Sequence, residues 1–233
     1  NVETNGVDKF IFVAEHVREE AIQLFNWDPN TTTVIPNYVD VNRLNQYKLP
    51  TASKTIGIIG IVPQRKRLDR ALNLVKGLVQ ADPSWKLIIK GKDPRNIEFM
   101  KAPSRANEME YYSSQFERIN NDPLLKSSVT WDEYSVSLSS WYRKIGFVLS
   151  PSDFESFHYS IADGVASGAV PIIWPWDGAK EIYTEDWVIE NTEDALSTIL
   201  STNFGNNEQS NRKIIEEKYG LERIFSKLES EMW

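Results

Sequence analysis

Residues 150–181 read SPSDFESFHYSIADGVASGAVPIIWPWDGAKE, and this stretch decides the fold. An apolar run, residues 147–149, leads into it, a helical pattern follows Glu155, and a second apolar run covers residues 170–173. Strand, loop, helix and strand form the repeating unit of a parallel sheet, which binds ligands at the carboxyl ends of its strands. We therefore predict an α/β fold with a Rossmann-like, doubly wound parallel sheet and a ligand site at the start of this helix.

Two acidic side chains, Glu155 and Asp163, are eight residues apart in this stretch. Eight helical residues turn through about 800°, so roughly 80° separates the two positions after whole turns. We expect Glu155 just before the helix and Asp163 two turns inside it, along one edge of a cleft. The helix N-terminus between them, at residues 156–159, offers free N–H groups to a phosphate. Two carboxylates that bind hydroxyl groups on either side of an anion site suit a nucleotide sugar.

The same stretch resembles the donor-binding, C-terminal half of GT-B glycosyltransferases, in the retaining group related to glycogen and sucrose synthases (glycosyl transferases group 1). Residues 163–171, DGVASGAVP, resemble the EAMASG-x-PV motif of that family, and residues 177–181, DGAKE, resemble its Gly-Gly-x-x-Glu turn. The resemblance implies that Glu155 contacts hydroxyl groups of the donor sugar and that Asp163, where the family has Glu, holds the ribose. It also implies a place for Glu181 near the donor sugar.

The residues between the two acids depart from the family. The family has Gly-Phe-Gly where this chain has Ser-Phe-His, so two glycines that allow backbone to approach phosphate have gained side chains. We still expect this segment to line the donor site, with His158 near the phosphate, where a protonated imidazole would be favoured. The expected donor-binding residues of the segment are Ser156, Phe157, His158 and Tyr159.

A basic loop follows the apolar residues 55–60 and precedes a helix predicted for residues 68–80. Three consecutive cations, Arg65, Lys66 and Arg67, stand in this loop of an otherwise acidic chain. By itself the run reads as a solvated turn. It resembles the family's Gly-Arg-x-x-x-x-Lys segment, which grips the donor diphosphate. Lys66 matches the family's Lys and Ile61 stands where Arg is expected, so we expect Lys66 and Arg65, together with Glu155, to form the catalytic set.

Other strand ends supply further candidates at the same edge. Gly60 and Gly91 end two predicted strands, 55–60 and 85–91, at turns where this fold usually meets the nucleotide. After a short strand at residues 128–131, Trp131 or Tyr134 could stack on the base, although either could equally be packing.

The rest of the chain predicts alternating strands and helices. We expect strands at residues 9–13, 32–36 and 187–189, and helices at 15–25, 108–120, 137–144, 192–200, 208–219 and 221–232. Residues 34–40, VIPNYVD, resemble the family's VIPNGVD, which marks the start of the C-terminal domain. We therefore expect residues 1–233 to form a single nucleotide-sugar-binding domain, with the acceptor-binding N-terminal half preceding residue 1.

Composition excludes several classes of function. There is no cysteine, hence no disulfide framework, thiolate nucleophile or cysteine-ligated metal. With a net charge of −7, a nucleic-acid partner is disfavoured. No apolar run reaches the length of a membrane span, which takes roughly 18 residues or more. We expect a cytoplasmic protein, with any peripheral association at a membrane made through the N-terminal half.

The expected function is transfer of a glycosyl group from a UDP- or GDP-sugar to a glycan or lipid-linked acceptor, in polysaccharide or glycoconjugate biosynthesis. The family implies retention of configuration, and cations and amides replace a metal or other cofactor. The isolated chain should bind donor but transfer poorly. Two alternatives stay open. One is half of a sugar-nucleotide 2-epimerase, and the other is a degenerate domain that binds a nucleotide or a protein.

Overall fold

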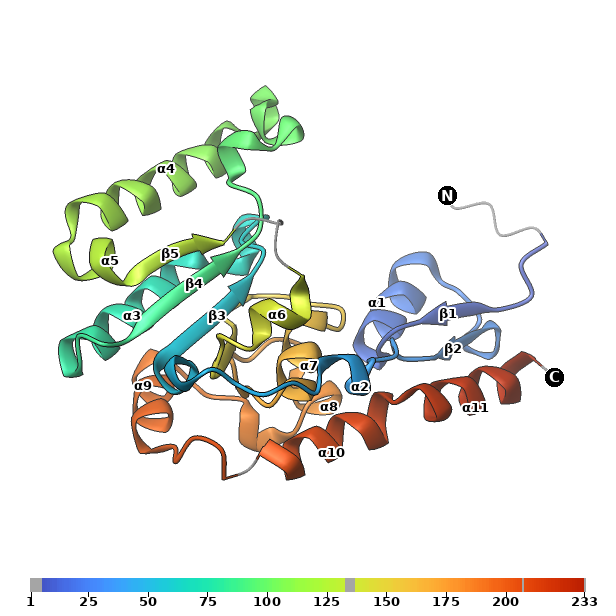
Figure 1. Cartoon of the computed structure of the whole chain (residues 1–233). Helices are drawn as coiled ribbons and strands as arrows, with labels where there is room; N and C mark the ends of the chain where they lie inside the picture. Colours follow the sequence, from blue (N-terminus) through green and yellow to red (C-terminus); the bar gives the residue numbers. More distant parts are fainter. Residues whose placement is uncertain (1–5, 133–136, 207, 233) are drawn as a thin grey trace.

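The computed structural model describes residues 6–132, 137–206 and 208–232, with a five-stranded sheet at its centre (Figure 1). All neighbouring strands are parallel, in the order β5-β4-β3-β6-β7. This confirms the predicted parallel sheet and places every carboxyl end at one edge. The strands are β3 Thr55–Ile59, β4 Lys86–Lys90, β5 Val129–Asp132, β6 Phe147–Ser150 and β7 Val170–Ile173.

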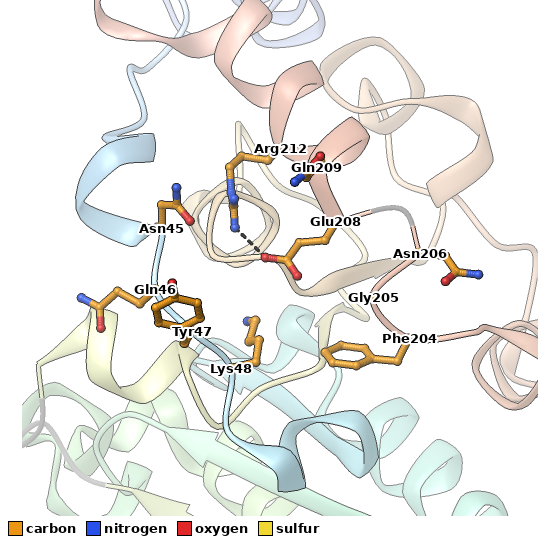
Figure 2. A pocket seen from close by; sticks show the side chains of 10 residues that line it. All are labelled: Asn45, Gln46, Tyr47, Lys48, Phe204, Gly205, Asn206, Glu208, Gln209 and Arg212. Atoms are coloured by element: carbon orange, nitrogen blue, oxygen red, sulfur yellow. Dashed lines mark hydrogen bonds and ion pairs between the residues drawn. The ribbon is translucent and has the colours of Figure 1, made fainter.

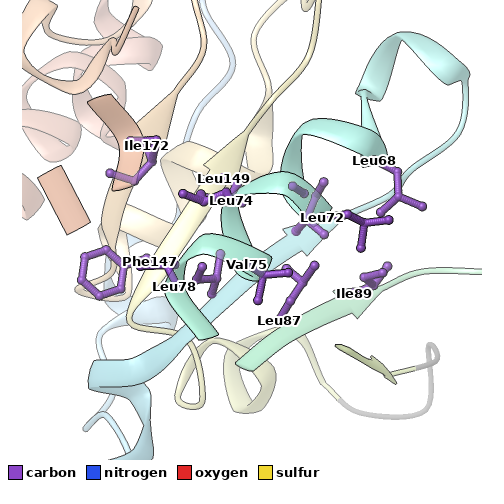
Figure 3. Close-up of a cluster of buried hydrophobic side chains, with 14 of the residues drawn as sticks. Leu68, Leu72, Leu74, Val75, Leu78, Leu87, Ile89, Phe147, Leu149 and Ile172 are labelled. Carbon is purple, nitrogen blue, oxygen red and sulfur yellow. The ribbon is translucent and has the colours of Figure 1, made fainter. Parts of the chain in front are cut away.

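Helices cover both faces of the sheet. Successive side chains of a strand point to opposite faces, so each central strand contributes to two apolar clusters. In β6, Phe147 and Leu149 belong to one apolar cluster and Val148 to the other. Helix α3 (Leu68–Ala81) packs on the first face with seven buried side chains (Figure 3). Helices α6 (Leu138–Tyr142) and α7 (Tyr159–Ala166) contribute to the second cluster.

Helix α7 lies unusually close to the sheet. A methyl group placed on Gly164 would lie 2.6 Å from Cγ1 of Val148, so no larger residue fits at this position. This contact fixes α7 against β6, and with it the loop that joins them at the carboxyl edge. Small residues in the predicted helix therefore serve packing.

The N-terminal residues form a separate unit. Strands β1 (Phe10–Phe12) and β2 (Thr32–Val34) pair in parallel with each other, apart from the central sheet, and α1 (Glu15–Phe25) connects them. Helix α11 (Leu221–Met232) runs beside this unit (Figure 1), and Lys9 Nζ lies 2.6 Å from Glu231 Oε2. The end of the chain thus returns to its beginning.

One predicted strand is wrong. Residues 185–187 form a 3₁₀ turn instead, with Trp187 N–H donating to Thr184 and Val188 N–H donating to Glu185. These local bonds use the donors that a strand would need, and a single parallel bridge between Val188 and Ile173 remains.

Helix boundaries are otherwise close to the predictions, and three short helices, α2 (Val41–Leu44), α5 (Pro123–Ser128) and α8 (Ala179–Ile182), were missed. Helix α5 begins after Asp122, whose side chain caps it, with proline at the first helical position. None of the described helices is both long and apolar enough to cross a membrane. The remaining helices are α4 Ala106–Asn121, α9 Thr192–Ser201 and α10 Glu208–Tyr219.

Candidate functional site

Three residues expected to form the catalytic set come together at the carboxyl edge. Lys66 Nζ donates to Glu155 Oε1 at 2.5 Å, and Arg65 Nη1 lies 3.6 Å from Glu155 Oε2. Arg65 also donates to the carbonyl of Phe154. The β3–α3 loop and the β6–α7 loop are therefore joined by charge-assisted contacts.

Glu155 is buried, yet its carboxylate is well supplied with donors. Ser152 Oγ donates to Glu155 Oε1 at 2.7 Å, in addition to Lys66. Burial acts to raise the pKa of Glu155, but the Lys66 ammonium and the two hydrogen bonds outweigh it, so the pKa lies below its ordinary value. Glu155 is thus a carboxylate, able to accept hydrogen bonds from hydroxyl groups.

His158 occupies its position in a glycine-like conformation. Its φ is +60°, in the left-handed region that favours glycine. Its Nδ1 lies 2.6 Å from Ser150 Oγ, and its buried Nε2 has no hydrogen-bond partner. Burial lowers the pKa of His158 to about 3, against the effect of Glu155. Burial therefore favours a neutral imidazole in the ligand-free protein. Protonation of His158 beside a bound phosphate stays a prediction.

The hydroxyl group of Tyr183 hydrogen-bonds to the turn that leads into α7. Tyr183 donates to the carbonyls of Phe157 and His158, at 2.8 and 2.9 Å. No side chain caps the first turn of α7. The N–H of Ile161 donates to the carbonyl of His158, whereas, among the described residues, the N–H groups of Tyr159 and Ser160 stay free to meet an anion. The helix begins at Tyr159, which places Asp163 just over one turn inside it and not two as expected.

Asp163 lies on α7 as a mostly buried carboxylate. Burial raises the pKa of Asp163 to about 6, with Arg43 opposing this and Asp40 adding to it. Its side chain makes no hydrogen bond with another residue in the described ranges, so its oxygens remain available to a ligand.

The two predicted glycines lie side by side at the ends of β3 and β4. Gly60 N–H donates to the carbonyl of Lys90 at 2.8 Å, and a methyl group on Gly91 would lie 3.5 Å from Gly60 N. A methyl group on Gly60 would meet no atom within 4 Å, so this strand end faces open space. Both glycines have positive φ, at +68° and +144°. Backbone can therefore approach a ligand here.

The other predicted donor-binding residues differ in exposure. Ser156 is exposed, and Tyr159 is 47% exposed. Phe157 is buried against Tyr183 and Tyr219, so its backbone alone could meet a ligand. These positions leave a polar and aromatic rim around the start of α7.

Within the described residues, neither Trp131 nor Glu181 hydrogen-bonds or ion-pairs with Lys66 or Glu155. Trp131 donates its Nε1–H to the carbonyl of Gly91 at 2.6 Å and packs edge-on against Phe116. Tyr134 lies outside the described residues. Glu181 lines a separate cavity of about 330 Å³, between the N-terminal unit and α10, and its carbonyl accepts from Lys218.

His16 was missed by the sequence analysis. This residue of α1 places Nε2 2.9 Å from the carbonyl oxygen of Glu155, and a methyl group on Gly178 would lie 2.2 Å from His16 Nδ1. The N-terminal unit therefore touches the site loop directly. One signal was present in the sequence, since the chain has two histidines and His16 is one of them.

A cavity adjoins the ion pair. Its volume is about 470 Å³, and Arg65, Arg67 and Asp153 are among its lining residues. Arg67 Nη1 lies 3.0 Å from Asp153 Oδ1, so charges of both signs line the space. The described residues contain no group of three or more His, Cys, Asp or Glu side chains placed to hold a metal.

Comparisons with known proteins show the fold. No protein-family model matches this chain, and no curated protein sequence does. Solved structures do match, at less than 25% identity. S. aureus TarM, in complex with fondaparinux, α-GlcNAc-glycerol and UDP, has a TM-score of 0.74 at 19% identity, over 97% of this chain and 44% of TarM.

Two further structures agree. Anabaena HepE, in complex with UDP and glucose, has a TM-score of 0.75 at 13% identity, over 97% of this chain and 63% of HepE. Sucrose-phosphate synthase from Thermosynechococcus elongatus has a TM-score of 0.69 at 15% identity, over 94% of this chain and 56% of the synthase. The chain thus has the fold of GT-B glycosyltransferase domains and spans about half the length of the structures it matches.

Proposed function

We propose that this chain binds a nucleoside-diphosphate sugar at the carboxyl edge of its sheet, as the donor-binding part of a glycosyltransferase. The observation that carries the proposal is the Lys66–Glu155–Arg65 cluster beside the open ends of β3 and β4. Complexes of TarM and HepE with UDP support it.

The ion pair orients Lys66 and leaves it donors to spare. An ammonium group has three N–H donors, and among the described residues Lys66 Nζ gives one, to Glu155. Two donors remain for a phosphate. Removal of the Lys66 charge would also leave Glu155 buried with weaker compensation, so the pair couples the anion site to the carboxylate.

Each residue of the proposed site has a distinct role. Lys66, Arg65 and the free N–H groups at the start of α7 stabilise negative charge on the departing phosphate. Glu155 accepts hydrogen bonds from the donor sugar, and Asp163 accepts them from the ribose. The bond between the anomeric carbon and the β-phosphate oxygen breaks and leaves its electron pair on that oxygen, beside the cations. The anomeric carbon bonds to a hydroxyl oxygen of the acceptor, whose proton passes to the released phosphate. The proposal includes retention of configuration and independence of metal, as the family resemblance implies.

A degenerate domain that binds a protein is the second candidate. The observation that favours it is a side chain at a glycine position, His158, together with Ile61, which is buried where the family has Arg. Such a domain would bind no nucleotide.

Calorimetric titration with UDP, GDP and ADP tests the proposal. We expect one nucleotide to bind, and a Lys66→Ala, Arg65→Ala double variant to lose about 1.5–3 kcal/mol per charged contact. Lys54→Ala is the matched control, because Lys54 pairs with Asp82 on an exposed surface. If no nucleotide binds at millimolar concentration, the donor-site proposal fails and the degenerate domain is favoured.

A further inference from the structure

A large cavity lies at the opposite, amino-terminal edge of the sheet. It has a volume of about 830 Å³ and lies between residues 45–48 on one side and residues 204–206 and 208–212 on the other (Figure 2). Helix α7 links the two edges, since Tyr159 begins it near Glu155 and the carbonyl of Ala166 at its end accepts from Arg212. Its eight residues, at 1.5 Å each, separate the edges by about 12 Å. The cavity is therefore distinct from the proposed donor site.

The charged side chains on the floor of this cavity are hydrogen-bonded or ion-paired within the protein. Lys48 Nζ donates to the carbonyls of Tyr142 and Ile145, at 2.9 and 2.7 Å, and to Ser167 Oγ at 2.9 Å. Arg212 Nη2 lies 2.7 Å from Glu208 Oε1, the contact drawn in Figure 2. With its cations paired or saturated, the cavity offers no free charge that selects a charged ligand.

The walls carry side-chain amides from two distant parts of the sequence. None of the amide side chains that line the cavity hydrogen-bonds to another residue within the described ranges. An amide both donates and accepts, as a hydroxyl group does, so amides can pair with successive hydroxyls of a sugar. The four lining amides are Asn45, Gln46, Asn206 and Gln209.

Aromatic rings stand beside these amides. Tyr47 is 91% exposed and packs against no other ring in the described part of the chain. Phe204 lines the other wall, its ring 6.1 Å from that of Phe147. An exposed ring can cover the apolar face of a pyranose and regain burial that Tyr47 lacks in the free protein.

The groove continues past the 204–208 segment. An adjoining cavity of about 230 Å³ shares Gly205 and Glu208 with the first and is lined by two more amides, Asn203 and Asn211, and by the exposed Asp186. The two cavities together therefore offer polar lining over a length greater than that of one sugar ring.

We propose that this groove is a second, non-catalytic site that binds a neutral oligosaccharide. Amides without protein partners, one exposed aromatic ring and, in the larger cavity, internally paired charges match a ligand that has many hydroxyl groups and no charge. The net charge of −7 and the paired Arg212 disfavour an anionic polymer. This inference stands on the amino-terminal edge alone, so it does not depend on the proposed donor site.

Titration with a panel of neutral oligosaccharides tests the inference, with maltoheptaose, cellohexaose and tetra-N-acetylchitotetraose as probes. We expect at least one to bind, with Tyr47→Ala weakening the affinity about tenfold through the loss of ring contact. Tyr47→Phe keeps the ring and should stay within about twofold of wild type. Gln209→Ala should weaken binding, whereas Gln80→Ala, at an exposed glutamine of α3, should not.

UDP titrations of the same proteins keep the two proposals separable. Lys66→Ala should bind the oligosaccharide as wild type does while losing UDP, and Tyr47→Ala should do the reverse. Failure of all three oligosaccharides to bind, or unchanged binding by Tyr47→Ala, would overturn the groove proposal whatever UDP does. Absence of UDP binding with intact oligosaccharide binding would overturn the donor site alone.

Discussion

Two lysines at opposite edges of one sheet show how the same side chain can serve packing or binding. At the amino-terminal edge, Lys48 gives all three of its donors to two carbonyls and a hydroxyl. Burial lowers the pKa of Lys48 to about 7, against the effect of Glu208. At the carboxyl edge, Lys66 gives one donor to Glu155 and, within the described residues, keeps two. A saturated cation joins segments, whereas an unsaturated one can receive an anion.

Replacement of Lys48 should have the largest effect on stability. Lys48→Met leaves the carbonyls of Tyr142 and Ile145 without this donor and separates the 45–48 segment from α6 and α7, which we expect to cost about 3 kcal/mol of unfolding free energy. Urea denaturation measures it, with Lys54→Met as the exposed control. A loss below about 0.5 kcal/mol would remove the structural role assigned to Lys48.

Asp163→Asn should raise the stability of the fold, whereas Lys48→Met should lower it. The raised pKa of Asp163, about 6, means that the folded state binds a proton which the unfolded state releases between pH 4 and 6. Stability from this group is therefore present below about pH 4 and lost as pH rises through 6. At pH 7.5 the variant should gain about 2 kcal/mol of stability and lose UDP affinity.

Urea denaturation of Asp163→Asn and wild type across pH 4–8 measures how the stability difference between the two proteins depends on pH. The stability difference should grow with pH and level off above pH 6. A difference that does not vary with pH would contradict burial as the cause. Stability gained together with UDP binding lost is the pattern of a carboxylate kept for binding rather than packing.

Arg65→Ala should affect binding and spare the fold. Arg65 is 41% exposed, so its removal leaves little buried, while the loss of one charged phosphate contact should cost about 1.5 kcal/mol of UDP binding, or about tenfold in affinity. Arg95→Ala, at another exposed arginine, is the calorimetric control. Equal UDP affinity in Arg65→Ala and wild type would remove Arg65 from the anion site.

The smallest expected difference concerns the backbone at His158. His158→Gly relieves a positive φ but loses the contact with Ser150, whereas His158→Ala loses the contact and keeps the strain. The glycine variant should therefore be about 1 kcal/mol more stable than the alanine variant. Thermal unfolding of the pair measures this, and equal stability would contradict the strain.

Local patterns predicted most of the fold and part of the site. Apolar runs and helical periodicity predicted α10 at residues 208–219 to the residue, and the family resemblance predicted Lys66 and Glu155 in one site, where they form an ion pair. Trp187 was misassigned because three apolar residues suit a strand or a 3₁₀ turn equally.

Contacts made by distant segments were beyond the sequence. His16 meets the carbonyl of Glu155 across 139 residues, and no local pattern encodes that approach. Lys48 looks like any loop lysine in the sequence, since its acceptors come from the ends of α6 and α7 and become neighbours when the helices pack. The sequence likewise did not predict that β1 and β2 pair only with each other and stay outside the central sheet, because tertiary packing decides this.

Backbone amide NMR of the chain titrated with UDP tests the central claim most directly, because it reports both edges at once. We expect the largest changes in chemical shift at Gly60, Gly91 and the start of α7, residues 158–160, and no change at residues 45–48 and 204–206. Changes confined to the amino-terminal edge, or no changes at millimolar UDP, would contradict a nucleotide site at the carboxyl edge.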